Sequence, residues 1–372
     1  MSSGAAPFAH RIVTWQRRHG RHDLPWQNTR DAYRIWLSEI MLQQTQVSTV
    51  LPYYERFVAA YPDVAALAAA SIDRVLQLWS GLGYYRRAHH LHAAACEVVE
   101  RHGGSFPTDA ATLQSLPGIG RSTAAAIAAF SSGERAAILD GNVKRVLARH
   151  RGIDGYPGSP EVQTRLWSAA DALLPPSRDI ASYTQGLMDL GATLCLRRNP
   201  QCEACPVSED CVARREGRIH SLPAPRPVRV RPERAVRLLI IEHSGTILLE
   251  RRPPTGVWSG LWSLPEVKLD EDVRVAMKTK FALDVQAGEA MPVLRHEFTH
   301  FALTMHPQLV RVARVADVCA QQETIWLAPD DAIAAALPSP IRKLLRALRT
   351  DDQRGTPTAH KRRSADKRAS AS

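Results

Sequence analysis

The chain has 372 residues, which is enough for two or three domains that each bury a hydrophobic core. Its 48 Lys and Arg residues outnumber its 37 Asp and Glu residues, and the formal net charge of +11 favours a polyanionic partner, first nucleic acid and second an acidic membrane surface. No window approaches the roughly 18 apolar residues of a membrane span, and no apolar signal-peptide core follows the start. We therefore expect a cytoplasmic protein without membrane segments, although a basic protein without such a partner would carry the same charge.

Residues from about 8 to 218 predict successive α-helices, because apolar residues recur at helical spacing between short Gly and Pro interruptions. Residues 1–22 contain no acid, as transit peptides do, but Phe8, Ile12 and Val13 recur at helical spacing and indicate a first helix of the fold. We expect an all-α domain over residues 1–221.

The composition changes abruptly after this domain. Residues 222–234 (LPAPRPVRVRPER) contain four prolines and four arginines and predict an extended linker. Two apolar runs, 236–242 and 246–252, then predict a β-hairpin around the turn HSG, followed by a helix over 266–285 and strands over 294–315. We expect a mixed α/β domain over residues 235–348, and a basic, disordered tail over 349–372.

Four of the six cysteines crowd into one loop of the helical domain. In a chain without export signals, such clustering indicates a metal site rather than a disulfide framework. The pattern C-x6-C-x2-C-x5-C is compatible with zinc or with an iron-sulfur cluster, and we expect its role to be structural. The candidate ligands are Cys195, Cys202, Cys205 and Cys211.

The segment LPGIGRSTAAAI, residues 116–127, predicts a helix, a Gly-x-Gly turn and a second helix that starts at Arg121. Gly118 and Gly120 would leave backbone N–H groups unobstructed near a helix N-terminus, where a phosphate is favoured. A plain turn between helices is the alternative, but the basic charge of the chain favours the phosphate.

Two carboxylates stand in contrasting surroundings. Asp140 follows an apolar run and precedes a helix, so it predicts an N-cap, and a helix N-terminus favours the ionised form. Glu39 is flanked by Trp36 and Ile40, among other apolar residues, and burial there would raise its pKa. One protonated and one ionised carboxyl group are what cleavage of a glycosidic bond requires.

Five segments and the four-cysteine loop together resemble the helix-hairpin-helix DNA glycosylase superfamily, and within it the MutY-type adenine DNA glycosylase family. The resemblance covers residues from about 8 to 348. It implies an all-α helix-hairpin-helix domain with an iron-sulfur loop that binds a [4Fe-4S] cluster, and an α/β Nudix-like C-terminal domain. The segments are LSEIMLQQTQV (37–47), GLGYYRRAHHLH (81–92), LPGIGRSTAAAI (116–127), LDGNVKRVLAR (139–149) and QGLMDLGATLC (185–195).

The resemblance implies a role for each matching residue. Glu39 would protonate the departing adenine, Asp140 would stabilise the positive sugar, and Asn142 would help to order the site. The flipped adenine would lie against Leu24 and Trp26 and contact Gln185. The residues implied to bind DNA are Gln44 and Tyr84, which would fill the gap in the base stack, and Gly118, Gly120 and Ser122 of the hairpin.

Ser122 stands where lyase-competent relatives of the endonuclease III type carry a lysine that forms a Schiff base with the sugar. A serine has no amine for this reaction. We therefore expect an enzyme that uses water and leaves an abasic site.

The second domain resembles the Nudix-like domain of the same family, but the helix after GVWSGLWSLPEV (256–267) has no R-E-x-x-E-E arrangement to hold a catalytic Mg²⁺. Recognition is therefore expected rather than hydrolysis. The segment EFTHF resembles a family loop that reads 8-oxoguanine, which implies this role for Phe298, Thr299 and His300. Thr299 replaces the more usual serine.

The sequence thus predicts a monomeric adenine DNA glycosylase whose partner is double-stranded DNA with A:8-oxoguanine or A:G mispairs. One alternative is an oxidised-pyrimidine glycosylase/lyase, which Ser122 and the long C-terminal domain oppose. Another is a noncatalytic lesion-binding protein, which the presence of both Glu39 and Asp140 opposes.

Overall fold

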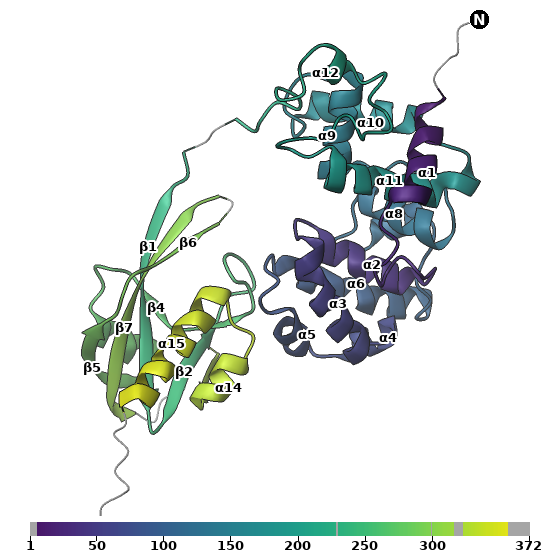
Figure 1. Ribbon diagram of the computed structural model, residues 1–372. Helices are drawn as coiled ribbons and strands as arrows, with labels where there is room; N and C mark the ends of the chain where they lie inside the picture. Colours follow the sequence, from purple (N-terminus) through teal and green to yellow (C-terminus); the bar gives the residue numbers. More distant parts are fainter. Residues whose placement is uncertain (1–5, 228–229, 299, 316–322, 356–372) are drawn as a thin grey trace, which may run out of the picture. The chain divides into compact units, whose positions relative to one another are not determined.

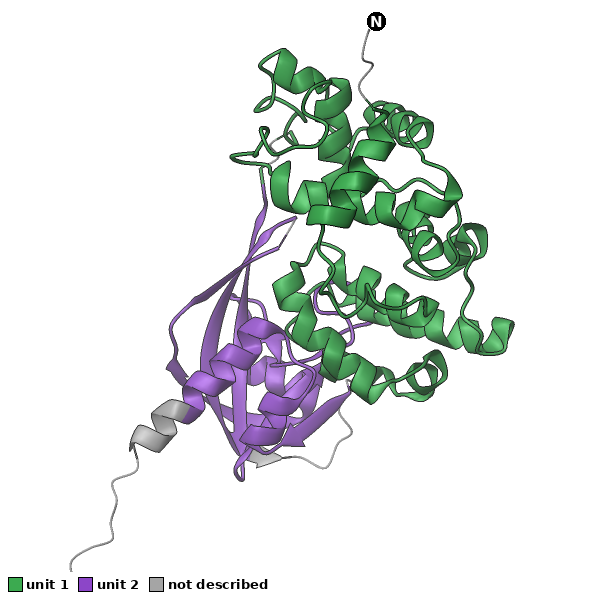
Figure 2. Ribbon diagram, turned by 45° about the vertical axis from the view of Figure 1, so that its right-hand side comes forward, with its two compact units in different colours: residues 1–230 green, residues 231–372 purple. Residues whose placement is uncertain are grey.

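The computed structural model describes residues 6–227, 230–298, 300–315 and 323–355. The chain divides into two compact units, Met1–Val230 and Arg231–Ser372, drawn in green and purple in Figure 2. The first unit is helical and the second is built on a β-sheet, as the sequence predicts. In the described part of the chain, no helix is both long and apolar enough to cross a membrane.

Several helices of the first unit begin after an Asp or Ser whose side chain accepts a hydrogen bond from the first turn, for example Asp31 before α2 and Asp140 before α9. A π-helical turn, Leu190–Leu194, follows α11. The helices are α1 (Phe8–His19), α2 (Ala32–Leu42), α3 (Val47–Ala60), α4 (Val64–Ala69), α5 (Ile72–Trp79), α6 (Arg86–His102), α7 (Ala110–Ser115), α8 (Arg121–Ser131), α9 (Gly141–Arg151), α10 (Pro160–Ala172), α11 (Ile180–Asp189) and α12 (Val212–Arg215).

Figure 1 shows α1 and α9–α12 at one end of this unit and α3–α6 at the other, with α2 and α8 between them. One hydrophobic core joins α1 to α8–α11 and includes Ile12, Val143 and Leu187. Around α2 and α3 lie other large buried side chains, among them Trp36 and Phe57. In this arrangement α2, α8 and α11 all contribute residues to one cavity.

The second unit is a mixed sheet in the order β3-β2-β1-β7-β5, in which β1 and β7 run parallel. The predicted hairpin is confirmed, because Glu242 pairs with Ile247 and His243 with Thr246. The strands are β1 (Glu233–His243), β2 (Thr246–Arg251), β3 (Trp262–Ser263), β4 (Glu266–Val267), β5 (Leu283–Ala290), β6 (Leu294–Glu297), β7 (Ala302–Val315) and β8 (Thr324–Leu327), and the helices are α13 (Val273–Phe281), α14 (Pro329–Ala334) and α15 (Ser339–Gly355).

Two predicted boundaries differ from the structure. The helix predicted over 266–285 is limited to α13, because Asp272 caps it and its two ends pair in the sheet as β4 and β5. Residues 349–355, predicted as part of the tail, form the last turns of α15, whose earlier turns are fixed by the buried residues Leu344 and Leu345. Residues 356–372 lie outside the described residues.

Candidate active site

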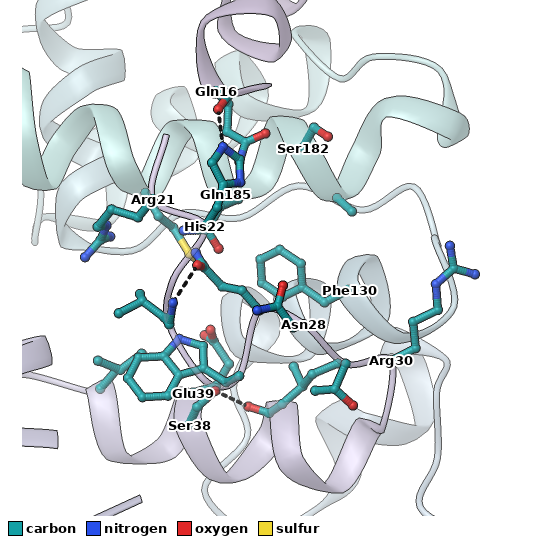
Figure 3. Close-up of a pocket in the computed structure, with 18 of the residues that line it drawn as sticks. Gln16, Arg21, His22, Asn28, Arg30, Ser38, Glu39, Phe130, Ser182 and Gln185 are labelled. Atoms are coloured by element: carbon teal, nitrogen blue, oxygen red, sulfur yellow. Dashed lines mark hydrogen bonds between the residues drawn. The ribbon is translucent and has the colours of Figure 1, made fainter. Parts of the chain in front are cut away.

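Helices α2, α8 and α11 and the segment between α1 and α2 line a cavity of about 390 Å³ in the first unit. The family resemblance implied that Glu39, Leu24, Trp26 and Gln185 act together on one base, and the structure brings all four to this cavity. Figure 3 shows Glu39 rising from α2 below Asn28 and Phe130. The volume of the cavity falls in the range of about 300–1,000 Å³ that small-molecule sites occupy.

Glu39 reaches this cavity from the middle of α2, a helix most of whose other residues are buried. Trp36 and Ile40 flank it in the core, and Ser38 donates a hydrogen bond to the Ile35 carbonyl at 2.7 Å. Burial, together with the nearby charge of Asp140, raises the pKa of Glu39 to about 8. Glu39 is therefore protonated at neutral pH, as the sequence predicted.

Asp140 is the N-cap of α9, and its side chain accepts a hydrogen bond of 2.7 Å from the Val143 amide. Its pKa is nevertheless raised, because burial outweighs the amides of Val143 and Asn142 and the charges of Arg145 and Lys144. The helix N-terminus was expected to keep Asp140 ionised, and burial opposes this effect. Asp140 does not line the cavity, although it is near enough to Glu39 to affect that group's pKa.

Asn142 also lies outside the cavity lining. Its carboxamide oxygen accepts a hydrogen bond of 3.0 Å from Arg145, which also donates to the Gly191 carbonyl at 2.6 Å. A Cβ atom on Gly191 would lie 2.5 Å from the Cβ of Asn142, so the start of α9 packs tightly on the turn after α11. Asn142 thus fixes the position of the helix that carries Asp140.

Gln185 is held by a buried carboxylate that the sequence did not reveal as part of the site. Its amide donates to Asp189 at 2.9 Å, and Asp189 is fully buried. Arg21 forms an ion pair with Asp189 at 2.7 Å and also donates from its backbone amide at 3.0 Å. Since Arg21 and Gln185 both line the cavity, this network fixes one of its walls.

Several other cavity residues were missed by sequence reasoning. They lie in or near the recognised segments, but their residue types, taken singly, are typical of helix faces and loops. Only the run LPWQNTR, which continues the predicted wall, could have indicated part of this set. The main ones are Met188 and the five residues labelled in Figure 3, which are His22, Asn28, Arg30, Phe130 and Ser182.

The Gly-x-Gly turn joins α7 and α8 as predicted. Gly118 has φ +79°, and a Cβ atom there would lie 2.7 Å from the Cβ of His90, so only glycine fits. Gly120, the N-cap of α8, faces open space. Ser122 turns inward instead, and its hydroxyl accepts a hydrogen bond of 2.9 Å from the Leu139 amide, next to Asp140.

Gln44 and Tyr84 lie in loops outside the cavity lining, and both are exposed. Each has a positive φ, +56° for Gln44 and +48° for Tyr84. Neither is a glycine, so both backbones are strained.

The four cysteines of the 195–211 loop are free thiols that line one small cavity with Val146, Leu190 and Val207. Arg149 donates to Cys195 Sγ at 3.3 Å, which suits a thiolate. Burial raises the pKa of Cys205 and of Cys211, so a bound cationic centre is needed to keep these sulfurs ionised. Among the described residues no group of three or more His, Cys, Asp or Glu is arranged around a single metal ion.

Three family models match successive parts of the chain. The model of HhH-GPD superfamily base excision DNA repair proteins matches residues 37–171, that of the iron-sulfur binding domain of endonuclease III matches 195–211, and that of the NUDIX domain matches 236–347. The structure of a thermostable thymine-DNA glycosylase is 31% identical and covers 56% of this chain and 95% of its own, with a TM-score of 0.51.

Curated relatives match over most of the length. The adenine DNA glycosylase of Buchnera aphidicola from Acyrthosiphon pisum is 34% identical over 91% of this chain and 96% of its own length. Those of Mus musculus and Homo sapiens are 34% and 32% identical, each over 95% of this chain and over 80% and 76% of their own lengths. The chain belongs to the adenine DNA glycosylase family.

Membership of the adenine DNA glycosylase family confirms several predictions. The chain is a DNA glycosylase of base excision repair with the predicted fold class, it binds DNA, and its cysteine loop belongs to a [4Fe-4S] domain. The zinc alternative for this loop is thereby set aside.

The second unit of this adenine DNA glycosylase carries an aromatic cluster at the predicted recognition loop. Phe298 contacts His296 and Trp258, with ring centroids 4.6 Å and 5.5 Å apart, and stacks on Phe301 at 4.6 Å. His300 is exposed. Thr299 lies outside the described residues. Sequence reasoning did not single out His296, in β6 just before the loop, or Trp258, which reaches it from another part of the sheet unit.

Proposed function

We propose that this enzyme hydrolyses the N-glycosidic bond of adenine opposite 8-oxoguanine or guanine in duplex DNA, as a monomer, and leaves an abasic site. One observation carries the proposal: the cavity lined by Leu24, Trp26 and Gln185 contains a carboxyl group, Glu39, with a pKa of about 8. Such a group holds a proton at neutral pH and can donate it to a leaving base.

The bond breaks as its electron pair moves to the base while Glu39 donates its proton to the departing adenine. The sugar becomes positively charged, and Asp140, which is close enough to interact with Glu39, stabilises that charge as a carboxylate. The resulting Glu39 carboxylate accepts a proton from the water that attacks the sugar. This cycle restores both carboxyl groups.

Ser122 supports the assignment of water as the nucleophile. Its hydroxyl is already engaged with the Leu139 amide, and it offers no amine to form a Schiff base. Borohydride should therefore trap little wild-type protein on DNA.

Binding of DNA is proposed to involve two groups of residues. Gly118 and Gly120 present backbone amides to a phosphate, supported by the open space around Gly120. Gln44 and Tyr84, both exposed, fill the gap that the flipped adenine leaves in the base stack.

The cluster loop and the sheet unit have supporting roles in this proposal. Cys195, Cys202, Cys205 and Cys211 hold the [4Fe-4S] cluster, which supplies a rigid crosslink for residues 195–211. Phe298, Thr299 and His300 read 8-oxoguanine, and the aromatic rings packed around Phe298 support this role for the loop.

A duplex with adenine opposite 8-oxoguanine, labelled on the adenine strand, tests the proposal. After incubation with the purified protein, half of the sample is treated with hot alkali. We expect strand cleavage only after alkali. Cleavage without alkali would indicate a lyase of the endonuclease III type, whereas an intact strand in both halves, with retained binding, would indicate a lesion-binding protein. Size-exclusion chromatography with and without DNA tests the monomer.

A further inference from the structure

The loops that carry Gln44 and Tyr84 come from different parts of the chain, yet both are strained in the same way. Left-handed backbone at a residue other than glycine costs roughly 1–3 kcal/mol and persists only where the surroundings hold it. Tyr84 is 50% exposed and Gln44 is also exposed, so their own side chains do not hold these conformations. Neighbouring groups must therefore do so.

One buried side chain touches both loops. The Arg87 guanidinium donates to the Gln43 carbonyl at 2.8 Å and to Thr45 Oγ1 at 3.1 Å, on either side of Gln44. It also donates to the Gly83 carbonyl, adjacent to Tyr84, at 3.2 Å, and it lies 5.4 Å from the Tyr84 ring centroid.

The same guanidinium also contacts the end of α2. It donates to the carbonyls of Ile40 at 2.9 Å and Met41 at 2.7 Å. These residues directly follow Glu39. Arg87 therefore joins, through one rigid planar group, the helix of the acid and both strained loops.

The charge of Arg87 is kept in a buried position by backbone groups. Arg87 is only 8% exposed, and among the described residues no carboxylate forms an ion pair with it. Burial lowers its pKa to about 10, which leaves it charged at neutral pH. The carbonyls at the C-terminus of α2 carry partial negative charge and compensate for this cation.

We propose that Arg87 is a positioning residue that holds the loops of Gln44 and Tyr84 in register with α2, so that opening of the base stack is coupled to presentation of adenine to Glu39. This proposal rests on the proposed function. It assigns Arg87 no contact with DNA.

A lysine at this position should fail, because a single ammonium group cannot match a planar fork that bonds five acceptors, four within residues 40–45 and one at Gly83. Displacement of reacting groups by about 1 Å can cost on the order of 10²-fold in rate. We therefore expect Arg87→Lys to lose on the order of 10²-fold in excision rate. The matched control is Arg86→Lys, the same change at the exposed neighbouring residue of α6.

The experiment uses the whole protein with its cluster and measures two quantities on the same duplex, which has 2-aminopurine beside the target adenine. Stopped-flow fluorescence reports opening of the stack, and single-turnover cleavage after alkali reports excision. We expect Arg87→Lys to slow both and Arg86→Lys to leave both unchanged. Equal losses in the two variants would attribute the effect to local charge and overturn the proposal.

A double-mutant cycle separates positioning from general stability. In a protein with Gln44→Ala and Tyr84→Ala, the added loss from Arg87→Lys should nearly disappear, since the side chains it positions are already absent. An undiminished added loss would overturn the proposal. If Arg87→Lys does not fold, Thr45→Val removes one acceptor and replaces it in both experiments.

Failure of the proposed function would look different. A wild type that opens the stack in an Arg87-dependent way but excises no adenine contradicts the proposed function and retains the role of Arg87. If the wild type excises adenine and the Arg87→Lys variant opens the stack as fast as the wild type, the proposed function is retained and the role of Arg87 is contradicted. A wild type that does neither overturns both.

Discussion

Each unit of the molecule contains a carboxyl group whose pKa is raised by burial, and the two differ in what surrounds them. Glu39 in the helical unit, with a pKa of about 8, borders a cavity of about 390 Å³. Glu250 in the sheet unit, with a pKa of about 7, accepts a hydrogen bond of 3.3 Å from the Glu266 amide and lies 3.8 Å from Arg252.

The difference teaches that a perturbed pKa alone does not identify a catalytic acid. Glu250 is 6% exposed, and Arg252 is also bonded to Glu266 at 2.8 Å, so the group forms part of a closed ion-pair network. Glu39 has a second carboxyl group, Asp140, as its electrostatic neighbour and space for a base in front of it. Access to a ligand-sized space separates the two cases.

The largest expected effect comes from removing each carboxyl group in turn. Glu39→Gln should lower the single-turnover excision rate by about 10²–10⁴-fold, the usual contribution of a general acid, because the amide cannot donate a strongly acidic proton. Glu250→Gln is the matched control and should leave that rate within about twofold, since Glu250 is engaged within the sheet unit. Binding to the mispaired duplex should survive in both variants, and wild-type turnover by Glu39→Gln would remove the assigned role.

A smaller effect is expected from pH. A carboxyl group with a pKa of about 8 keeps its proton below this pH and loses it above, so the excision rate should fall about tenfold per pH unit beyond pH 8. On the acid side the excision rate should fall as Asp140 is protonated. The apparent pKa values of the two limbs of the pH–rate profile belong to the interacting pair Glu39 and Asp140 rather than to either residue alone. Single-turnover rates across the pH range provide the measurement, and an alkaline limb that stays flat would contradict the assignment of Glu39.

The smallest effect is expected in the sheet unit. Phe298→Ala with His300→Ala should reduce the preference for adenine opposite 8-oxoguanine over adenine opposite guanine by roughly tenfold, equivalent to the loss of about 1.4 kcal/mol. Excision opposite guanine should change little, because the cavity in the helical unit is untouched. The ratio of the two excision rates measures this preference, and an unchanged ratio would move lesion recognition to other residues.

The sequence predicted the parts of the site that are carried by short motifs. The family resemblance of these motifs implied that Leu24, Trp26, Glu39 and Gln185 act on one base, so their meeting in one cavity could be expected. Phe130 and Met188 were missed because they reach the cavity only through the packing of α8 and α11. A single sequence does not reveal such long-range contacts.

The raised pKa of Asp140 could not be predicted for a related reason. Its N-cap position is a local property that the sequence reveals, whereas the burial that outweighs it arises from packing. The helix predicted over 266–285 failed in the same way, since pairing of its ends with β1 and β7 overrides local periodicity.

The hydrogen bond between the Ser122 hydroxyl and the Leu139 amide has an evolutionary consequence. A change from Ser122 to lysine would add a nucleophile, but it would also remove the acceptor of an amide that adjoins Asp140, at a cost of about 1–3 kcal/mol if that amide stays buried. A Ser122→Lys variant, which gains the nucleophile for lyase chemistry, is therefore expected to be less stable beside Asp140.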